Sequence, residues 1–167
     1  EWPGIGDADD IAFTGHFDGN EKRISGFTSS TALFPYIGTS GKVKNLTLAG
    51  EVTYDLTGCG KETNVGPLAK RTRGNLIDCN SEVNVVLTST EKITNEFRAG
   101  GVSGYMTGGS MVGCCYSGNL EWDENSSTSG NSRIGGIVGF INTESASLEE
   151  CSLAGTVSLN ASSTGTM

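Results

Sequence analysis

Histidine, proline and charged residues are scarce in this 167-residue chain, which has one His, three Pro and 18% Asp, Glu, Lys and Arg. No apolar run approaches the roughly 20 residues that a membrane-spanning helix needs. Apolar residues also show no sustained 3.6-residue spacing, so the pattern of an amphipathic helix is missing. We therefore expect no membrane insertion by this chain and no all-α fold.

The sequence also lacks the motifs of the common enzyme classes. It contains no GxSxG, HExxH, phosphate-binding loop or dinucleotide fingerprint. The single histidine, His16, has no acid-base partner near it in sequence, so we interpret it as a surface residue. The outward acids Glu51, Glu82 and Glu121 are scattered. We expect no catalytic residues, no metal and no cofactor, and keep a polysaccharide-active enzyme with paired groove carboxylates as a low-ranked alternative.

Basic residues are outnumbered, with 11 Lys and Arg against 19 Asp and Glu and a net charge of −8. This balance opposes binding to nucleic acid and to anionic lipid. Four acids near the start, Asp7, Asp9, Asp10 and Asp18, raise the question of calcium. Their spacing fits neither an EF-hand nor a Gly-Asp nonapeptide repeat, so solvated loop acids are the favoured interpretation.

The five cysteines are an odd number and include no CxxC pair, which opposes both a closed disulfide framework and a zinc site. Cys79, Cys114 and Cys151 share one position of a repeat with Leu46. A metal or redox ladder is one interpretation; a column of small buried apolar side chains is the favoured one. Strand alternation turns Cys115 away from Cys114, and pairing of Cys115 with Cys59 remains an alternative.

Glycine, by contrast, is abundant, with 25 residues, and the chain is internally repetitive. Apolar residues recur in columns 33 to 37 positions apart, and two of these columns lie two residues from each other, as in a strand. Gly50, Gly118 and Gly155 mark sharp bends. The columns are Leu33, Leu68, Val102, Ile137; Val43, Leu76, Met111, Leu148; Leu46, Cys79, Cys114, Cys151; Val52, Val85, Leu120, Val157; and Tyr54, Leu87, Trp122, Leu159.

Columns of this kind arise when successive coils stack as parallel strands about 4.8 Å apart. We therefore predict an all-β, right-handed parallel β-helix of four to five coils, with a repeat near 35 residues. Residues 1–167 form one domain, with an atypical entry coil over 1–30 and four repeats over 31–167. Variable loops are expected at 57–65, 89–98 and 123–132, with 124–131 mobile, and a turn at Asp18-Gly19-Asn20. The chain ends soon after a strand, so we expect a fragment of a longer protein.

The segments Gly101-Val102-Ser103-Gly104 and Gly136-Ile137-Val138-Gly139, each followed by an apolar residue and a Cys-containing strand, resemble the GLUG repeat. Ser103 departs from the apolar residue of that motif, and Gly66-Pro67-Leu68-Ala69 lacks its second glycine. The resemblance implies a parallel β-helix in an extracellular or cell-surface bacterial protein, adhesin-like or acting as a spacer.

On this reading the first functional hypothesis is a non-catalytic binding module that presents a solenoid face to a host glycan or protein; a structural spacer is the alternative. Lys70, Arg71 and Arg73 place three basic residues within four positions of an acidic chain, where the repeat departs from its pattern. Arginine suits bidentate capture of carboxylate or sulfate. We predict ligand binding there, against the simpler alternative of a charged turn that protects a sheet edge.

Overall fold

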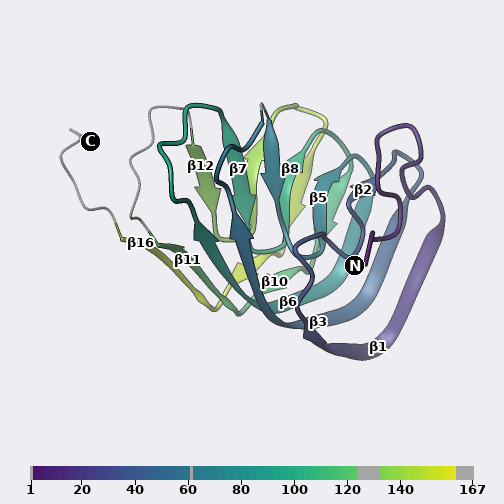
Figure 1. The fold of residues 1–167 in the computed structure, drawn as a ribbon. Coiled ribbons are helices and arrows are strands. Elements are labelled where there is room, and N and C mark those ends of the chain that lie inside the picture. Colours follow the sequence, from purple (N-terminus) through teal and green to yellow (C-terminus); the bar gives the residue numbers. More distant parts are fainter. Residues whose placement is uncertain (1, 61, 124–131, 161–167) are drawn as a thin grey trace.

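The computed structural model describes residues 2–60, 62–123 and 132–160, and these form a parallel β-solenoid with a repeat of about 34 residues (Figure 1). The backbone coils through three sheets, and the strands pair in parallel throughout the described residues. The strands are β1 (His16–Phe27), β2 (Tyr36–Ile37), β3 (Lys42–Asp55), β4 (Thr63–Val65), β5 (Ala69–Thr72), β6 (Asn75–Thr88), β7 (Phe97–Gly100), β8 (Ser103–Met106), β9 (Ser110–Val112), β10 (Cys115–Tyr116), β11 (Asn119–Asp123), β12 (Ser132–Gly135), β13 (Val138–Ile141), β14 (Ser147–Glu149), β15 (Ser152–Leu153) and β16 (Thr156–Asn160).

The solenoid has about three turns, fewer than the four to five coils predicted from the sequence. The broad sheet contains five stacked rungs, in the order β1, β3, β6, β9–β11 and β14–β16. The two short sheets contain four strands (β2, β5, β8, β13) and three strands (β4, β7, β12). A turn is complete only where all three sheets contribute a strand, so the first and last rungs of the broad sheet belong to incomplete turns.

The broad sheet confirms the predicted apolar columns. Val43 pairs with Leu76, which pairs with Met111, and Leu148 follows on the last rung. The columns that begin at Val52 and Tyr54 run in register through β3, β6, β11 and β16 in the same way. Inner members of these columns are almost completely buried and form the core. Alternation along a strand places every second side chain on the same face, which is why the sequence spacing revealed the register.

The predicted turn at Asp18-Gly19-Asn20 is instead a bulge inside the continuous strand β1. Asp18 Oδ1 accepts a hydrogen bond from the Asn20 backbone N at 2.9 Å, and Asn20 has a positive φ of 50°. Register with β3 shifts between Asp18 and Lys22, but the chain does not reverse. A bulge adds a residue and bends a strand without ending it. Positive φ recurs on the next four rungs, at Asn45, Asp78, Gly113 and Glu150.

The third side of the solenoid was hidden within the predicted loops. Strand β4 lies inside 57–65, and β7 and β12 begin at the ends of 89–98 and 123–132. These strands have only three or four residues, and their central outward positions are the polar Asn64, Arg98 and Arg133. Such short, polar-centred segments give no alternation strong enough to distinguish from a loop. The predicted mobile loop 124–131 lies outside the described residues.

Candidate functional site

The three predicted basic residues lie on or just after β5, but the structure separates them into two environments. Arg71 Nη1 and Arg73 Nη2 approach Asp9 Oδ2 at 3.0 and 3.2 Å. Arg71 Nε also donates a hydrogen bond to Thr107 Oγ1 at 3.3 Å. One entry-segment carboxylate thus holds both guanidinium groups. The pair fastens residues 2–15 to the second coil, and the two guanidinium groups share this single carboxylate.

Lys70 instead lines a cavity of about 350 Å³ with Trp2, Asp7 and three further residues. Trp2 is 47% exposed, so its indole forms an accessible wall beside the lysine. Lys70 is partly buried, which removes water from its ammonium group and lowers the pKa of that group. Among the described residues, Lys70 has no ion-pair partner within 4.0 Å. The remaining lining residues are Pro3, Thr31 and Pro35.

A second cluster lies where β7 and β12 face β8 and β13, and sequence reasoning did not predict it. The Arg98 guanidinium lies 4.1 Å from the centre of the Tyr105 ring, and Arg133 lies 4.1 Å from that of Phe140. The two rings stack at 5.7 Å with an interplanar angle of 5°. Each guanidinium group therefore lies over the aromatic ring of its own turn, and each contact combines cation–π attraction with apolar burial.

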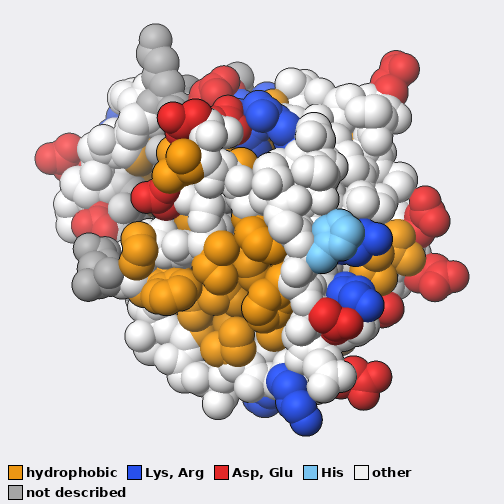
Figure 2. Space-filling model, turned by 90° about the vertical axis from the view of Figure 1, so that its right-hand side faces the viewer, with side chains coloured by type: hydrophobic (Ala, Val, Ile, Leu, Met, Phe, Trp, Pro, Cys, Tyr) orange, Lys and Arg blue, Asp and Glu red, His pale blue; other side chains and the backbone are white. Residues whose placement is uncertain are grey.

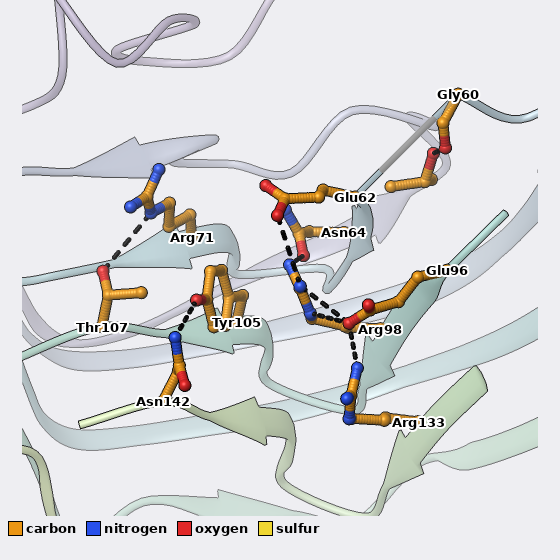
Figure 3. A network of polar contacts seen from close by, with 11 residues as sticks. Gly60, Glu62, Asn64, Arg71, Glu96, Arg98, Tyr105, Thr107, Arg133 and Asn142 are labelled. Carbon is orange, nitrogen blue, oxygen red and sulfur yellow. Dashed lines mark hydrogen bonds and ion pairs between the residues drawn. The ribbon is translucent and has the colours of Figure 1, made fainter. Parts of the chain in front are cut away.

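Acidic and amide side chains accept hydrogen bonds from the guanidinium groups of this cluster or form ion pairs with them (Figure 3). Glu96 accepts hydrogen bonds from Arg98 Nε at 2.8 Å and from Arg133 Nη1. Asn64 Oδ1 accepts from Arg98 Nη1 at 3.3 Å, and Glu62 lies 3.8 Å from Arg98 Nη2. The Arg98 side chain is only 5% exposed. A guanidinium so deeply buried and so fully partnered serves the packing of the coils, and little of it is accessible to a ligand.

Glycine allows the short sheets to approach each other this closely. A Cβ on Gly104 would lie 2.6 Å from Val65 N, and one on Gly139 would lie 2.6 Å from Ala99 N. Real Cβ atoms do not approach backbone nitrogen so closely, so each position requires glycine. These are the second glycines of the two Gly-x-x-Gly segments found in the sequence. The second glycine of the Gly-x-x-Gly motif is therefore explained by close packing of two backbones, and it points to no catalytic role.

The cysteine column occupies the core of the broad sheet. Leu46 pairs with Cys79 and both are buried, as is Cys114, while Cys151 on the last rung is half-buried. Burial raises the pKa of the Cys151 thiol. All five cysteines are free thiols, including Cys59 and Cys115, which are both partly exposed. The described residues contain no group of three or more His, Cys, Asp and Glu side chains that could hold a metal ion.

Two of the four acids considered for calcium are engaged with cations. Asp9 binds Arg71 and Arg73, and Asp18 Oδ2 lies 2.9 Å from Lys44 Nζ. The hydrogen bond from Lys44, together with those from Asn20 and Asn45, lowers the Asp18 pKa to about 2. Because the Asp18 side chain is exposed to solvent, these contacts arrange charge locally and imply no large stabilisation.

The missed residues did leave a signal in the sequence. Arg98 and Arg133 are 35 positions apart, as are Tyr105 and Phe140, and this matches the spacing of the apolar columns. Extending the columns to outward-facing positions would have found both pairs. Trp2 left no such signal, because its position beside Lys70 depends on the path of the non-repetitive entry segment.

Comparisons with known proteins give no assignment. A scan against protein-family models, a search of curated proteins and a search of solved structures each found no match. In the part of the chain that the structure describes, no helix has the length and apolar character needed to cross a membrane.

Proposed function

We propose that this chain is a non-catalytic β-helix of the GLUG-repeat type, from a bacterial cell-surface or secreted protein, that binds an acidic glycan. The right-handed coil expected for parallel crossovers is part of this proposal. The fit of Gly104 and Gly139 to a backbone contact supports the GLUG assignment, because the second glycine of each Gly-x-x-Gly segment then has a structural reason.

The cavity beside Lys70 is the observation that carries the binding function. An exposed indole such as Trp2 offers a flat apolar face against which a sugar ring can stack. Asp7 and Thr31 supply polar atoms for hydroxyl groups, and the unpaired Lys70 ammonium supplies a partner for a carboxylate or sulfate. An anion there would also offset the desolvation that lowers the Lys70 pKa.

Binding to arrays of acidic and neutral glycans at physiological salt tests this proposal. Trp2→Ala should weaken binding to every recognised glycan by about tenfold, which corresponds to about 1.4 kcal/mol. Lys70→Met keeps the aliphatic stem, and it should abolish the preference for acidic over neutral glycans. Lys92→Met removes the same charge from the exposed β6–β7 connection, and should leave binding unchanged.

Folded wild-type protein that binds no glycan would overturn the proposal and favour the spacer function. Equal losses in Lys92→Met and Lys70→Met would show general charge attraction in place of a site. Replacing Arg71 should act through the Asp9 contact, and therefore on the anchoring of the entry segment before it acts on ligand.

A further inference from the structure

The last rung of the broad sheet exposes the column positions that earlier rungs bury. Leu153 is 49% exposed, whereas Tyr116, its partner one rung earlier, is completely buried. Leu159 is 59% exposed, against 5% for Trp122 in the same column. The large side chains exposed at this end are Ile141, Leu148, Leu153, Val157 and Leu159. Together they form an apolar surface across the end of the coil, here called the C-terminal end.

Backbone groups at this end also lack partners among the described strands. β13, β14, β15 and β16 each pair with a strand of the preceding turn, and no described strand lies on their other side. A parallel edge of this kind presents a row of free N–H and C=O groups that can accept another parallel strand. The exposed apolar side chains and the free backbone groups therefore lie on the same end and could both bind one further strand.

The opposite end carries a matching edge. β1 pairs only with β3 among the described strands, and Ile24 on β1 is 36% exposed. Figure 2 views the molecule from the side on which β1 lies in Figure 1, and shows a broad apolar patch there. Phe17 is only partly buried and packs at the margin of the core.

The two ends share one register. Phe17 lies in the column that starts with Val43 and ends at Leu148. Ile24 lies above Leu48, in the column that ends at Leu153. If β1 followed the last rung in the same direction, Phe17 would cover Leu148 and Ile24 would cover Leu153. The bulge in β1 would fall beside Glu150, which also has a positive φ and stands at the same step of the rung.

Charge does not by itself select this register. Asp18 lies in the column of Lys44, which ends at Glu149, so these two carboxylates would come together. Lys44 already pairs with Asp18 at 2.9 Å, and Lys22 stands at the neighbouring level of Leu46. The apolar columns and the unpaired strand edges therefore carry the inference.

We infer that the C-terminal end of one copy binds the β1 edge of a second copy, so that the chains assemble head to tail through one continuous broad sheet. This inference does not depend on glycan binding. The contact joins two different surfaces, and its repetition does not close a ring through a two-fold axis; assembly is therefore open-ended and rises with protein concentration.

Blocking each end separately tests this inference. Leu153→Lys places a charge on the C-terminal end, and Ile24→Lys places one on the β1 edge; both positions are already exposed, so folding should be retained. Thr53→Lys adds the same charge to the exposed outer face of β3, on an inner rung, and serves as the control. Sedimentation velocity over a range of concentrations measures assembly, and circular dichroism confirms the fold.

Wild type and Thr53→Lys should form chains that lengthen with concentration, while each end-blocked variant should be monomeric, with association weakened at least about tenfold. An equimolar mixture of the two blocked variants should form dimers and no longer chains. The intact C-terminal end of Ile24→Lys can bind the intact β1 edge of Leu153→Lys, and both remaining ends of that dimer are blocked. Monomeric wild type would overturn the inference and show that the C-terminal end does not bind a second copy. Dimers of Ile24→Lys alone would overturn it in favour of two C-terminal ends in contact.

Discussion

The broad sheet and the two short sheets hold neighbouring coils together by different means. In the broad sheet, β3 and β6 each extend over 14 residues, pair along almost their whole length and cover continuous apolar columns. In the short sheets, strands of two to four residues contribute few backbone hydrogen bonds. There the coils depend on glycine contacts and on the stack of Arg98, Tyr105, Arg133 and Phe140. One sheet thus relies on a repeated pattern, and the others rely on particular side chains.

The largest effect is expected in the broad sheet, where the same substitution can be compared on an inner rung, which is covered by the next rung, and on the last rung. Leu87→Ala should lower the free energy of unfolding by about 2–5 kcal/mol, because Leu87 is completely buried and its removal leaves a cavity. Leu159→Ala, in the same column on the last rung, should cost less than about 1 kcal/mol. Urea unfolding of both variants measures the difference. Equal losses would show that Leu159 is covered in solution.

A smaller effect should come from the short sheets. Arg98→Met should lower the free energy of unfolding by about 1–3 kcal/mol, because it removes a buried guanidinium from the Tyr105 ring and from Glu96. Arg133 is more exposed, so Arg133→Met should cost less than about 1 kcal/mol. Urea unfolding provides the comparison. A wild-type stability for Arg98→Met would mean that the stack does not hold these coils together.

The smallest effect concerns the first rung and is visible only at acid pH. The Asp18 pKa is about 2 in the folded chain, against 3.8 for an ordinary aspartate, so folding is favoured while this carboxylate is charged. That contribution is present above about pH 4, and is lost as the pH falls toward 2. Between those values the melting temperature of wild type should fall more than that of Asp18→Asn. Parallel melting curves would contradict the assigned contact with Lys44.

The broad sheet could be predicted from the sequence because its pattern is repeated and apolar. Val43, Leu76, Met111 and Leu148 needed only to be aligned, and the structure places them in one register. The short strands could not be predicted, because three residues with one polar side chain at the centre resemble a loop. The bulge at Asn20 was taken for a turn for a related reason: Asp-Gly-Asn favours a local bend, but only the neighbouring strand determines whether the chain reverses.

The candidate site was predicted only in part. Sequence clustering identified Lys70, Arg71 and Arg73, but adjacent residues on β5 reach different surroundings, and Asp9, 62 positions before Arg71, determines the environment of two of them. The cavity at Lys70 depends on Trp2, which comes from a segment outside the repeat. Long-range contacts of a non-repetitive segment leave no periodic trace, so the sequence could not reveal them.

The positive φ that recurs at Asn45, Asp78, Gly113 and Glu150 bears on how a chain of this kind lengthens by gene duplication. A duplicated stretch of one whole repeat, about 34 residues, returns every left-handed position to its own place and extends the coil from any starting point. A duplication of another length would place β-branched residues in that conformation, where their side chains clash with the backbone. Changes in length are therefore expected in connections between strands, such as 89–96 and 142–146, where inserted sequence would leave the stacked coils unchanged.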